Sequence, residues 1–183
     1  MALDQRLGAI LRTRREPIMA QVRLAWWREM LERDPMQWPQ GEPVLEALRE
    51  WGDPSGLAAL VSGWEALLSE ELSSEVIAEF IAGRGAAFAG LARELGVDAI
   101  EPARRAAEIW ALADLAANIS DEAERARVVV YGRDLRVPRL PRALRPLAIL
   151  AGLGAEALRK GGAPLISGRA SALLVLRIGL FGR

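Results

Sequence analysis

The stretch Ser74–Leu95, which reads SEVIAEFIAGRGAAFAGLAREL, decides the fold class of this chain. Ala, Leu and Glu favour helices, and the stretch has few of the β-branched residues that favour strands. Ser73 and Ser74 suit the N-cap of a helix, and Gly96 can close its C-terminus in the left-handed conformation. One long helix is therefore predicted from about residue 74 to Leu95.

The sequence Gly83-Arg84-Gly85 lies in the middle of this predicted helix. It is not a phosphate-binding loop, because no strand precedes it and no lysine follows it. The small residues on both sides of Arg84 instead predict a close contact with a second helix.

Prolines and glycines divide the rest of the chain at intervals typical of helices. Further helices are predicted over residues 3–15, 17–33, 43–51, 53–68, 102–119, 142–159 and 167–181. The stretch 121–131 is compatible with a last helical turn or a short strand, and 132–141 is a connector rich in Arg and Pro. These elements predict an all-α fold, a helical bundle formed by residues 1–183 as a single domain.

The composition excludes several kinds of chemistry. The chain has no cysteine and no histidine, so it lacks disulfides, thiolate ligands and the commonest general base and metal ligand. Carboxylates, arginines, hydroxyls, Lys160 and Tyr131 remain. The N-terminus opens with charged residues, so we expect neither a secretory signal nor a membrane-spanning stretch. A cytoplasmic location is expected, with peripheral membrane association as an alternative.

Charge is distributed unevenly along the chain. Residues 1–122 carry 21 acidic and 12 basic side chains, a balance of −9, whereas residues 123–183 carry 3 acidic and 12 basic side chains, a balance of +9. Either the two parts neutralise each other within one fold, or the basic C-terminal third binds an anionic membrane surface or acidic partner. Nucleic acid is not expected, because this third has only Tyr131 and Phe181 for base stacking. The apolar run from Leu173 to Phe181 either packs in the bundle or lies on such a surface.

The most distinctive string is Arg23-Leu-Ala-Trp-Trp-Arg-Glu29. Trp26 and Trp27 point about 100° apart on a helix, so one can enter the core while the other lies at a packing seam. Arg23 lies one turn before Trp27 and can stack on its indole. The apolar residues that follow the 3.6-residue period in this helix are Ile18, Val22, Ala25, Trp26 and Met30.

Together with the preceding Glu16–Val22, this string resembles a segment of the squalene/phytoene synthase family, in particular its phytoene-synthase-like branch. The resemblance is specific over residues 1–50, includes Arg28, and is weaker around 144–148 and 161–162. It implies a truncated isoprenoid-synthase-like fold. Active members of the family hold Mg²⁺ on two aspartate-rich motifs that bind the diphosphates of two isoprenyl substrates.

Most of these metal ligands are absent from the matching positions. The first motif falls on Asp4, Gln5 and Gly8, which leaves one carboxylate of three. The second motif falls on Asn118, Glu122 and Ala126, with Asp121 and Asp114 nearby. The resemblance therefore implies vestigial motifs and a non-catalytic protein.

Three functions follow from this resemblance. The first is a scaffold or assembly factor, as for a mitochondrial member that assists assembly of a respiratory complex, with a protein partner and no cofactor. The second is a Mg²⁺-dependent prenyltransferase that condenses isoprenyl diphosphates. The third is a module that binds an isoprenoid lipid in an apolar cavity.

Two rows of glutamates are also candidate sites for a hard cation. They are Glu42, Glu46 and Glu50, and Glu71, Glu75 and Glu79. In each row the three carboxylates would share one face of a helix and could hold a cation. Such a row is more often a solvated face with arginine neighbours.

Overall fold

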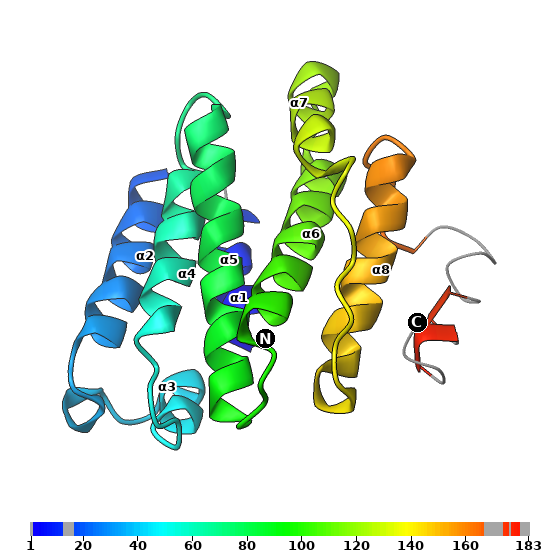
Figure 1. Ribbon diagram of the computed structural model, residues 1–183. Coiled ribbons are helices and arrows are strands. Elements are labelled where there is room, and N and C mark those ends of the chain that lie inside the picture. Colours follow the sequence, from blue (N-terminus) through cyan, green and yellow to red (C-terminus); the bar gives the residue numbers. More distant parts are fainter. Residues whose placement is uncertain (1, 13–16, 167–173, 176, 180–183) are drawn as a thin grey trace. The chain divides into compact units, whose positions relative to one another are not determined.

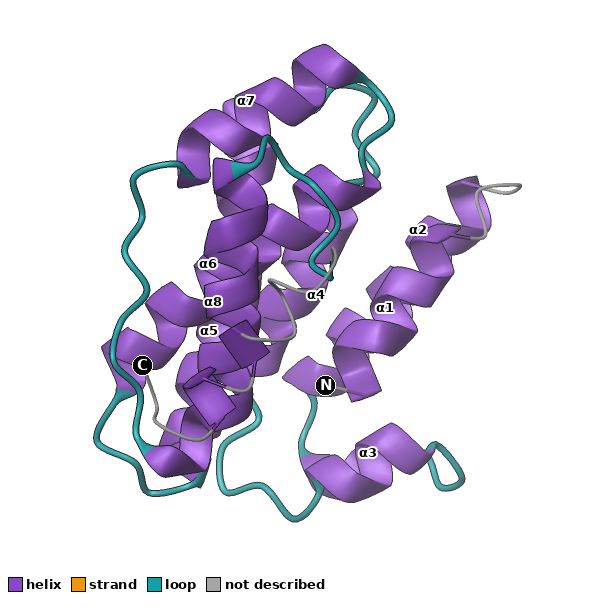
Figure 2. Ribbon diagram, turned by 90° about the vertical axis from the view of Figure 1, so that its right-hand side faces the viewer, coloured by secondary structure: helices purple, strands orange, loops and turns teal. Residues whose placement is uncertain are grey.

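The computed structural model describes residues 2–12, 17–166, 174–175 and 177–179. Its regular elements are helices, and no strand occurs among these residues, which confirms the predicted all-α class (Figures 1 and 2). The α-helices are α1 (Ala2–Arg12), α2 (Pro17–Glu32), α3 (Pro43–Leu48), α4 (Gly56–Ala66), α5 (Ser74–Glu94), α6 (Ile100–Asn118), α7 (Glu122–Gly132) and α8 (Arg145–Arg159). The short 3₁₀ helices are η1 (Pro35–Gln37) and η2 (Arg142–Leu144).

The chain forms two compact units, Met1–Gly90 and Leu91–Arg183, which we call unit 1 and unit 2. Helix α5 begins in unit 1 and its last turn belongs to unit 2. Whether the units behave as the single domain expected for residues 1–183 stays a prediction.

Close packing of α4 and α5 organises unit 1. A methyl group at Gly83 would lie 2.4 Å from the Ala59 carbonyl oxygen, and one at Gly63 would lie 3.1 Å from the Glu79 carbonyl oxygen. Only glycine allows such an approach between two helix backbones. The predicted helix contact at the Gly83-Arg84-Gly85 stretch is thereby confirmed.

Helix α2 packs against α1 and α4 through a different face from the one predicted by the 3.6-residue period of its apolar residues. Its buried residues are Ala20, Leu24, Trp27, Met30 and Leu31. Of the residues in the predicted stripe, Met30 is buried, whereas Ile18, Val22 and Trp26 are 75%, 55% and 37% exposed. The helix carries apolar residues on two faces, and periodicity alone does not tell which face meets the other helices.

In unit 2, α6 packs against α7 and α8. A methyl group at Gly154 of α8 would lie 3.2 Å from the Ala113 side chain of α6, so these helices also approach closely. The stretch 121–131, whose sequence is compatible with a helical turn or a strand, forms most of helix α7. Asp121 is the N-cap of this helix and accepts a hydrogen bond from the Glu124 N–H.

The predicted helix over 167–181 lies largely outside the described residues. Among those described, Ile178 is buried, and Arg145 donates a hydrogen bond of 2.9 Å to the Gly179 carbonyl. A methyl group at Gly152 of α8 would lie 2.5 Å from the Ile178 side chain. The described part of this segment therefore packs on α8.

Local signals set several helix ends. Gly96 has φ +62°, and the N–H groups of Gly96 and Val97 bond back to Arg93 and Ala92, which closes α5 as predicted. Asp53 does not cap α4 directly; it accepts from the Ser55 N–H, and the helix begins at Gly56. No described helix is long and apolar enough to cross a membrane.

Candidate functional site

A buried polar cluster joins α1, α4 and α5 inside unit 1, and it contains Asp4, the carboxylate on which the resemblance places the first motif. Asp4 Oδ1 accepts hydrogen bonds from Trp64 Nε1 at 2.9 Å and Arg84 Nε at 3.0 Å. Asp4 Oδ2 accepts from Arg84 Nη2 at 3.1 Å. We call Asp4, Trp64, Phe80 and Arg84 the Asp4 cluster.

Aromatic rings complete the surroundings of the arginine. The Arg84 guanidinium carbon lies 5.2 Å from the Trp64 ring centre and 4.9 Å from that of Phe80. The two rings themselves meet edge to face at 5.1 Å. Asp4 and Arg84 are 7% and 2% exposed, so the pair is shielded from water and its hydrogen bonds replace hydration.

This arrangement favours a structural role for Asp4 over a role as a metal ligand. Both carboxylate oxygens of Asp4 already accept hydrogen bonds, and a cation at Asp4 would lie against the positive charge of Arg84. The ion pair instead fixes the position of α1 against α4 and α5.

No pattern in the sequence identifies Arg84 as the partner of Asp4. Its signal is present, because a lone charge in the apolar run from Phe80 to Ala92 must either reach solvent or find a counter-charge. The sequence does not show that the counter-charge lies 80 residues earlier, in α1.

The residues on which the resemblance places the second motif lie in unit 2, where α6 ends and α7 begins. Asn118 donates to the Asp114 carbonyl at 2.8 Å, and Asp121 accepts from the Glu124 N–H at 2.9 Å. Glu122 is the first residue of α7 and is exposed. Asn118 and Asp121 therefore bond to local backbone, as residues at helix ends commonly do.

The residues that carried the family resemblance lie on α2. Trp27 is 4% exposed and Trp26 is 37% exposed, which confirms that the two indoles differ in burial. Their rings meet edge to face at 5.1 Å. Arg23 is exposed, and Arg28 forms an ion pair of 2.7 Å with Glu65 of α4.

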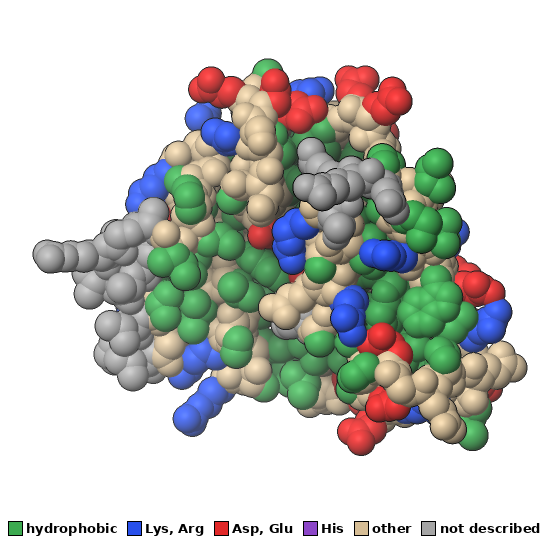
Figure 3. Space-filling model, turned by 180° about the vertical axis from the view of Figure 1, so that it is seen from behind, with side chains coloured by type: hydrophobic (Ala, Val, Ile, Leu, Met, Phe, Trp, Pro, Cys, Tyr) green, Lys and Arg blue, Asp and Glu red, His purple; other side chains and the backbone are tan. Residues whose placement is uncertain are grey.

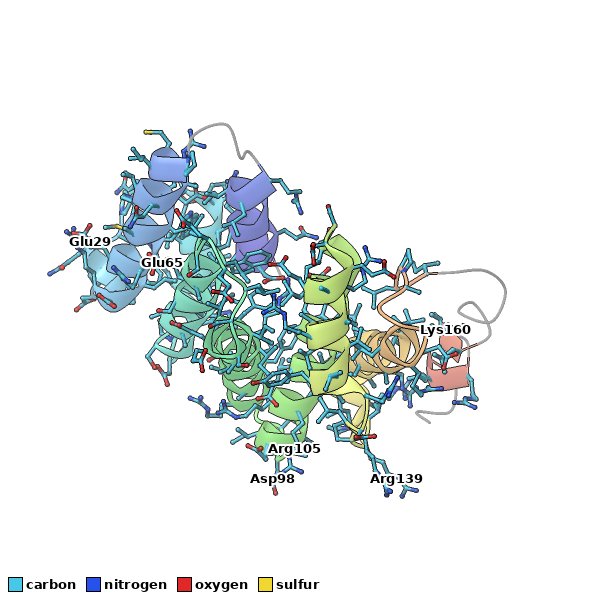
Figure 4. The ribbon with its side chains drawn as sticks, turned by 90° about the horizontal axis from the view of Figure 1, so that it is seen from above. Glu29, Glu65, Asp98, Arg105, Arg139 and Lys160 are labelled. Atoms are coloured by element: carbon cyan, nitrogen blue, oxygen red, sulfur yellow. The ribbon has the colours of Figure 1, made fainter. Side chains whose placement is uncertain are left out.

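Burial and ion pairing have opposite effects on the pKa of Glu65, which is labelled in Figure 4. Partial burial raises the pKa of Glu65, while the nearby Arg28 guanidinium lowers it. In the same figure Glu29, which pairs with Arg33, lies at the outer edge of unit 1. Burial likewise raises the pKa of Glu108 in α6, against the effect of Arg104.

The two glutamate rows do not form the single helical faces that a shared cation would need. Helix α3 ends at Leu48, before Glu50, and α5 begins at Ser74, after Glu71. Glu42 and Glu46 accept hydrogen bonds from the N–H groups of Val44 and Gly41. Ser73 donates a hydrogen bond to Glu75 that lowers the pKa of Glu75. Within the described ranges, no three acidic side chains cluster as metal ligands would.

Comparison with protein-family models, with curated proteins and with solved structures gives no match for this chain. The resemblance to the squalene/phytoene synthase family and the isoprenoid-synthase-like fold therefore stay predictions from the sequence.

Proposed function

We propose that this chain is a non-catalytic binding protein of squalene/phytoene synthase type that acts as a scaffold, an assembly factor or a lipid-binding module. The observation that carries the proposal is the hydrogen bonding of the Asp4 carboxylate. Arg84 and Trp64 together occupy both of its carboxylate oxygens, at distances of 2.9 to 3.1 Å. The group that would have to bind Mg²⁺ instead holds helices together.

The second motif supports the same conclusion. Asn118 and Asp121 bond within their own helix ends, and position 126 is an alanine. Glu122 alone keeps an exposed carboxylate at a matching motif position. One exposed carboxylate binds Mg²⁺ weakly, because stable sites combine several oxygen ligands.

The proposal predicts that purified protein incubated with Mg²⁺ and farnesyl or geranylgeranyl diphosphate releases no diphosphate above a blank without protein. A coupled assay for released diphosphate measures this directly. The matched variants are Asp4→Asn, which alters the buried cluster, and Glu122→Gln, which alters an exposed residue without disturbing packing.

Steady release of diphosphate that disappears in Glu122→Gln would overturn the proposal. It would favour the alternative, a Mg²⁺-dependent prenyltransferase that condenses isoprenyl diphosphates. Because Glu122 is exposed, a loss of activity in that variant cannot be attributed to unfolding, provided that its melting temperature is unchanged.

A further inference from the structure

Four arginines recur at every third position between α7 and α8. They are Arg133, Arg136, Arg139 and Arg142. Residues 135–141 form no regular secondary structure and cross unit 2 from the end of α7 to the opposite end, where α8 begins (Figure 1).

This connector favours the extended polyproline II conformation. Pro138 and Pro141 restrict their own φ angles and bias Val137 and Leu140 toward extended backbone. Pro141 itself has φ −66° and ψ 165°. Polyproline II repeats every three residues with a rise of about 3.1 Å per residue, so Arg136 and Arg139 would follow one edge about 9 Å from each other. Arg133 has helical backbone at the end of α7, and Arg142 begins η2, so these two arginines flank the extended stretch.

The four arginines form no ion pair within the described part of the chain. All four are exposed, and none forms a side-chain hydrogen bond there. Figure 4 shows Arg139 pointing away from the helices of unit 2. Between residues 125 and 145 the sequence contains seven arginines and one acidic residue, Asp134.

The other arginines of this stretch are engaged. Arg125 donates to the Ile119 carbonyl at 2.7 Å, Arg145 donates to the Gly179 carbonyl, and Arg127 lies 3.9 Å from Glu124. The chain therefore uses nearby arginines for its own fold but leaves this set of four without partners.

Exposed apolar side chains accompany the arginines. Val130 is 70% exposed, Leu135 43% and Val137 37%. Apolar side chains beside arginines match the boundary of an anionic bilayer, where aliphatic groups enter the acyl region and guanidinium groups bind lipid phosphates. A surface for single-stranded nucleic acid would need aromatic stacking groups, and Tyr131 is the single aromatic residue between 125 and 145.

We propose that Val130, Arg133, Leu135, Arg136, Val137, Arg139 and Arg142, which we call the arginine surface, bind the face of an anionic lipid bilayer. The inference is independent of the proposed lack of catalysis, because the assay below contains neither Mg²⁺ nor an isoprenyl diphosphate. It predicts contact with the headgroup layer and the adjoining edge of the acyl region, through side chains of the connector and its two ends rather than an inserted helix.

The test is co-sedimentation of the full chain with vesicles of phosphatidylcholine alone or with phosphatidylglycerol added, at low and high salt. We expect binding to the anionic vesicles at low salt, weaker binding at high salt because exposed charges are screened, and no binding to phosphatidylcholine. Since each basic residue at an anionic surface contributes about fivefold, Arg136→Glu with Arg139→Glu should lower the partition coefficient at least about 25-fold.

The matched control is Arg12→Glu with Arg23→Glu. These residues are also exposed and without a partner in the described chain, and their reversal changes net charge equally. Circular dichroism melts check that both variants fold. An equal loss of vesicle binding in the two double variants, or no binding of the parent protein to anionic vesicles at low salt, would overturn the proposal. So would displacement by inorganic phosphate, or by a single-stranded oligonucleotide at equal phosphate concentration.

Discussion

Arg84 and Asp4 form an ion pair whose two members depend on each other. Removing one member of a buried pair leaves the other charge without a partner in a low-dielectric environment. We therefore expect Arg84→Ala to lower the free energy of unfolding by about 3–5 kcal/mol. Urea unfolding followed by circular dichroism measures the change.

The double variant Asp4→Ala with Arg84→Ala separates pairing from packing. If the pair carries the effect, the double variant should be less destabilised than the sum of the two single variants. The exposed pair between Arg105 and Glu101, at 3.2 Å, is the control, and Arg105→Ala should cost less than about 1 kcal/mol. Additive single effects would show that the pair contributes only through packing.

Trp26 and Trp27 are neighbours in sequence with different environments. Trp27→Ala should cost about 3–5 kcal/mol, because it removes a large buried side chain and leaves a cavity. Trp26→Ala should cost about 1 kcal/mol, mainly through loss of its edge-to-face contact with Trp27. Thermal melts of both variants measure this, and equal losses of stability would contradict the difference in burial.

The helix pair α4 and α5 depends on glycine at the point of contact. An alanine methyl at position 83 would lie 2.4 Å from the Ala59 carbonyl oxygen, so Gly83→Ala should force the helices apart and cost about 1–3 kcal/mol. Gly90 lies in the same helix and a methyl group there meets nothing within 4 Å. Gly90→Ala should therefore raise the free energy of unfolding by about 0.5–1 kcal/mol through helix propensity. Denaturant melts measure both variants, and a decrease for Gly83→Ala with an increase for Gly90→Ala would confirm the contact.

Helices with local signals were predictable from the sequence, and those that depend on tertiary packing were not. Gly96 ends α5 through its own φ angle, so that boundary was correct, as was the close contact at Gly83. The exposed face of α2 was not predictable, because Val22 and Leu24 belong to two apolar stripes of similar quality. Figure 3 shows hydrophobic side chains that reach the surface, with acidic and basic side chains among them.

The candidate site shows the same difference between local features, which the sequence predicts, and tertiary contacts, which it does not. Asp4 was identified from a resemblance, but its partner in the structure is Arg84, a residue 80 positions away that no local pattern connects to it. Glu50 and Glu71 were placed in rows that require helices longer than α3 and α5. Helix length there is set by a turn at residues 49–50 and by Ser73, whose hydroxyl accepts from the Val76 N–H at 3.3 Å.

At the scale of the whole molecule, α5 is the element that both units share. Its residues up to Gly90 belong to unit 1, and its last four residues belong to unit 2. Four residues cannot persist as a helix alone, because helix nucleation is unfavourable and short segments are unstable in water. Unfolding of unit 1 should therefore also unfold the end of α5 that leads into α6.

This coupling predicts one cooperative unfolding transition, as expected for a single domain. Arg84→Ala alters unit 1 only, yet it should lower the unfolding free energy reported by the slowest-exchanging amides of α6 and α8 as much as that reported by α4. Native-state hydrogen exchange measures all three helices in one experiment. Arg105→Ala serves as the control, because it is a surface change in α6 that should lower the unfolding free energy reported by each helix by less than about 1 kcal/mol. Reduced protection in α4 with unchanged protection in α6 and α8 would show instead that the two units unfold independently.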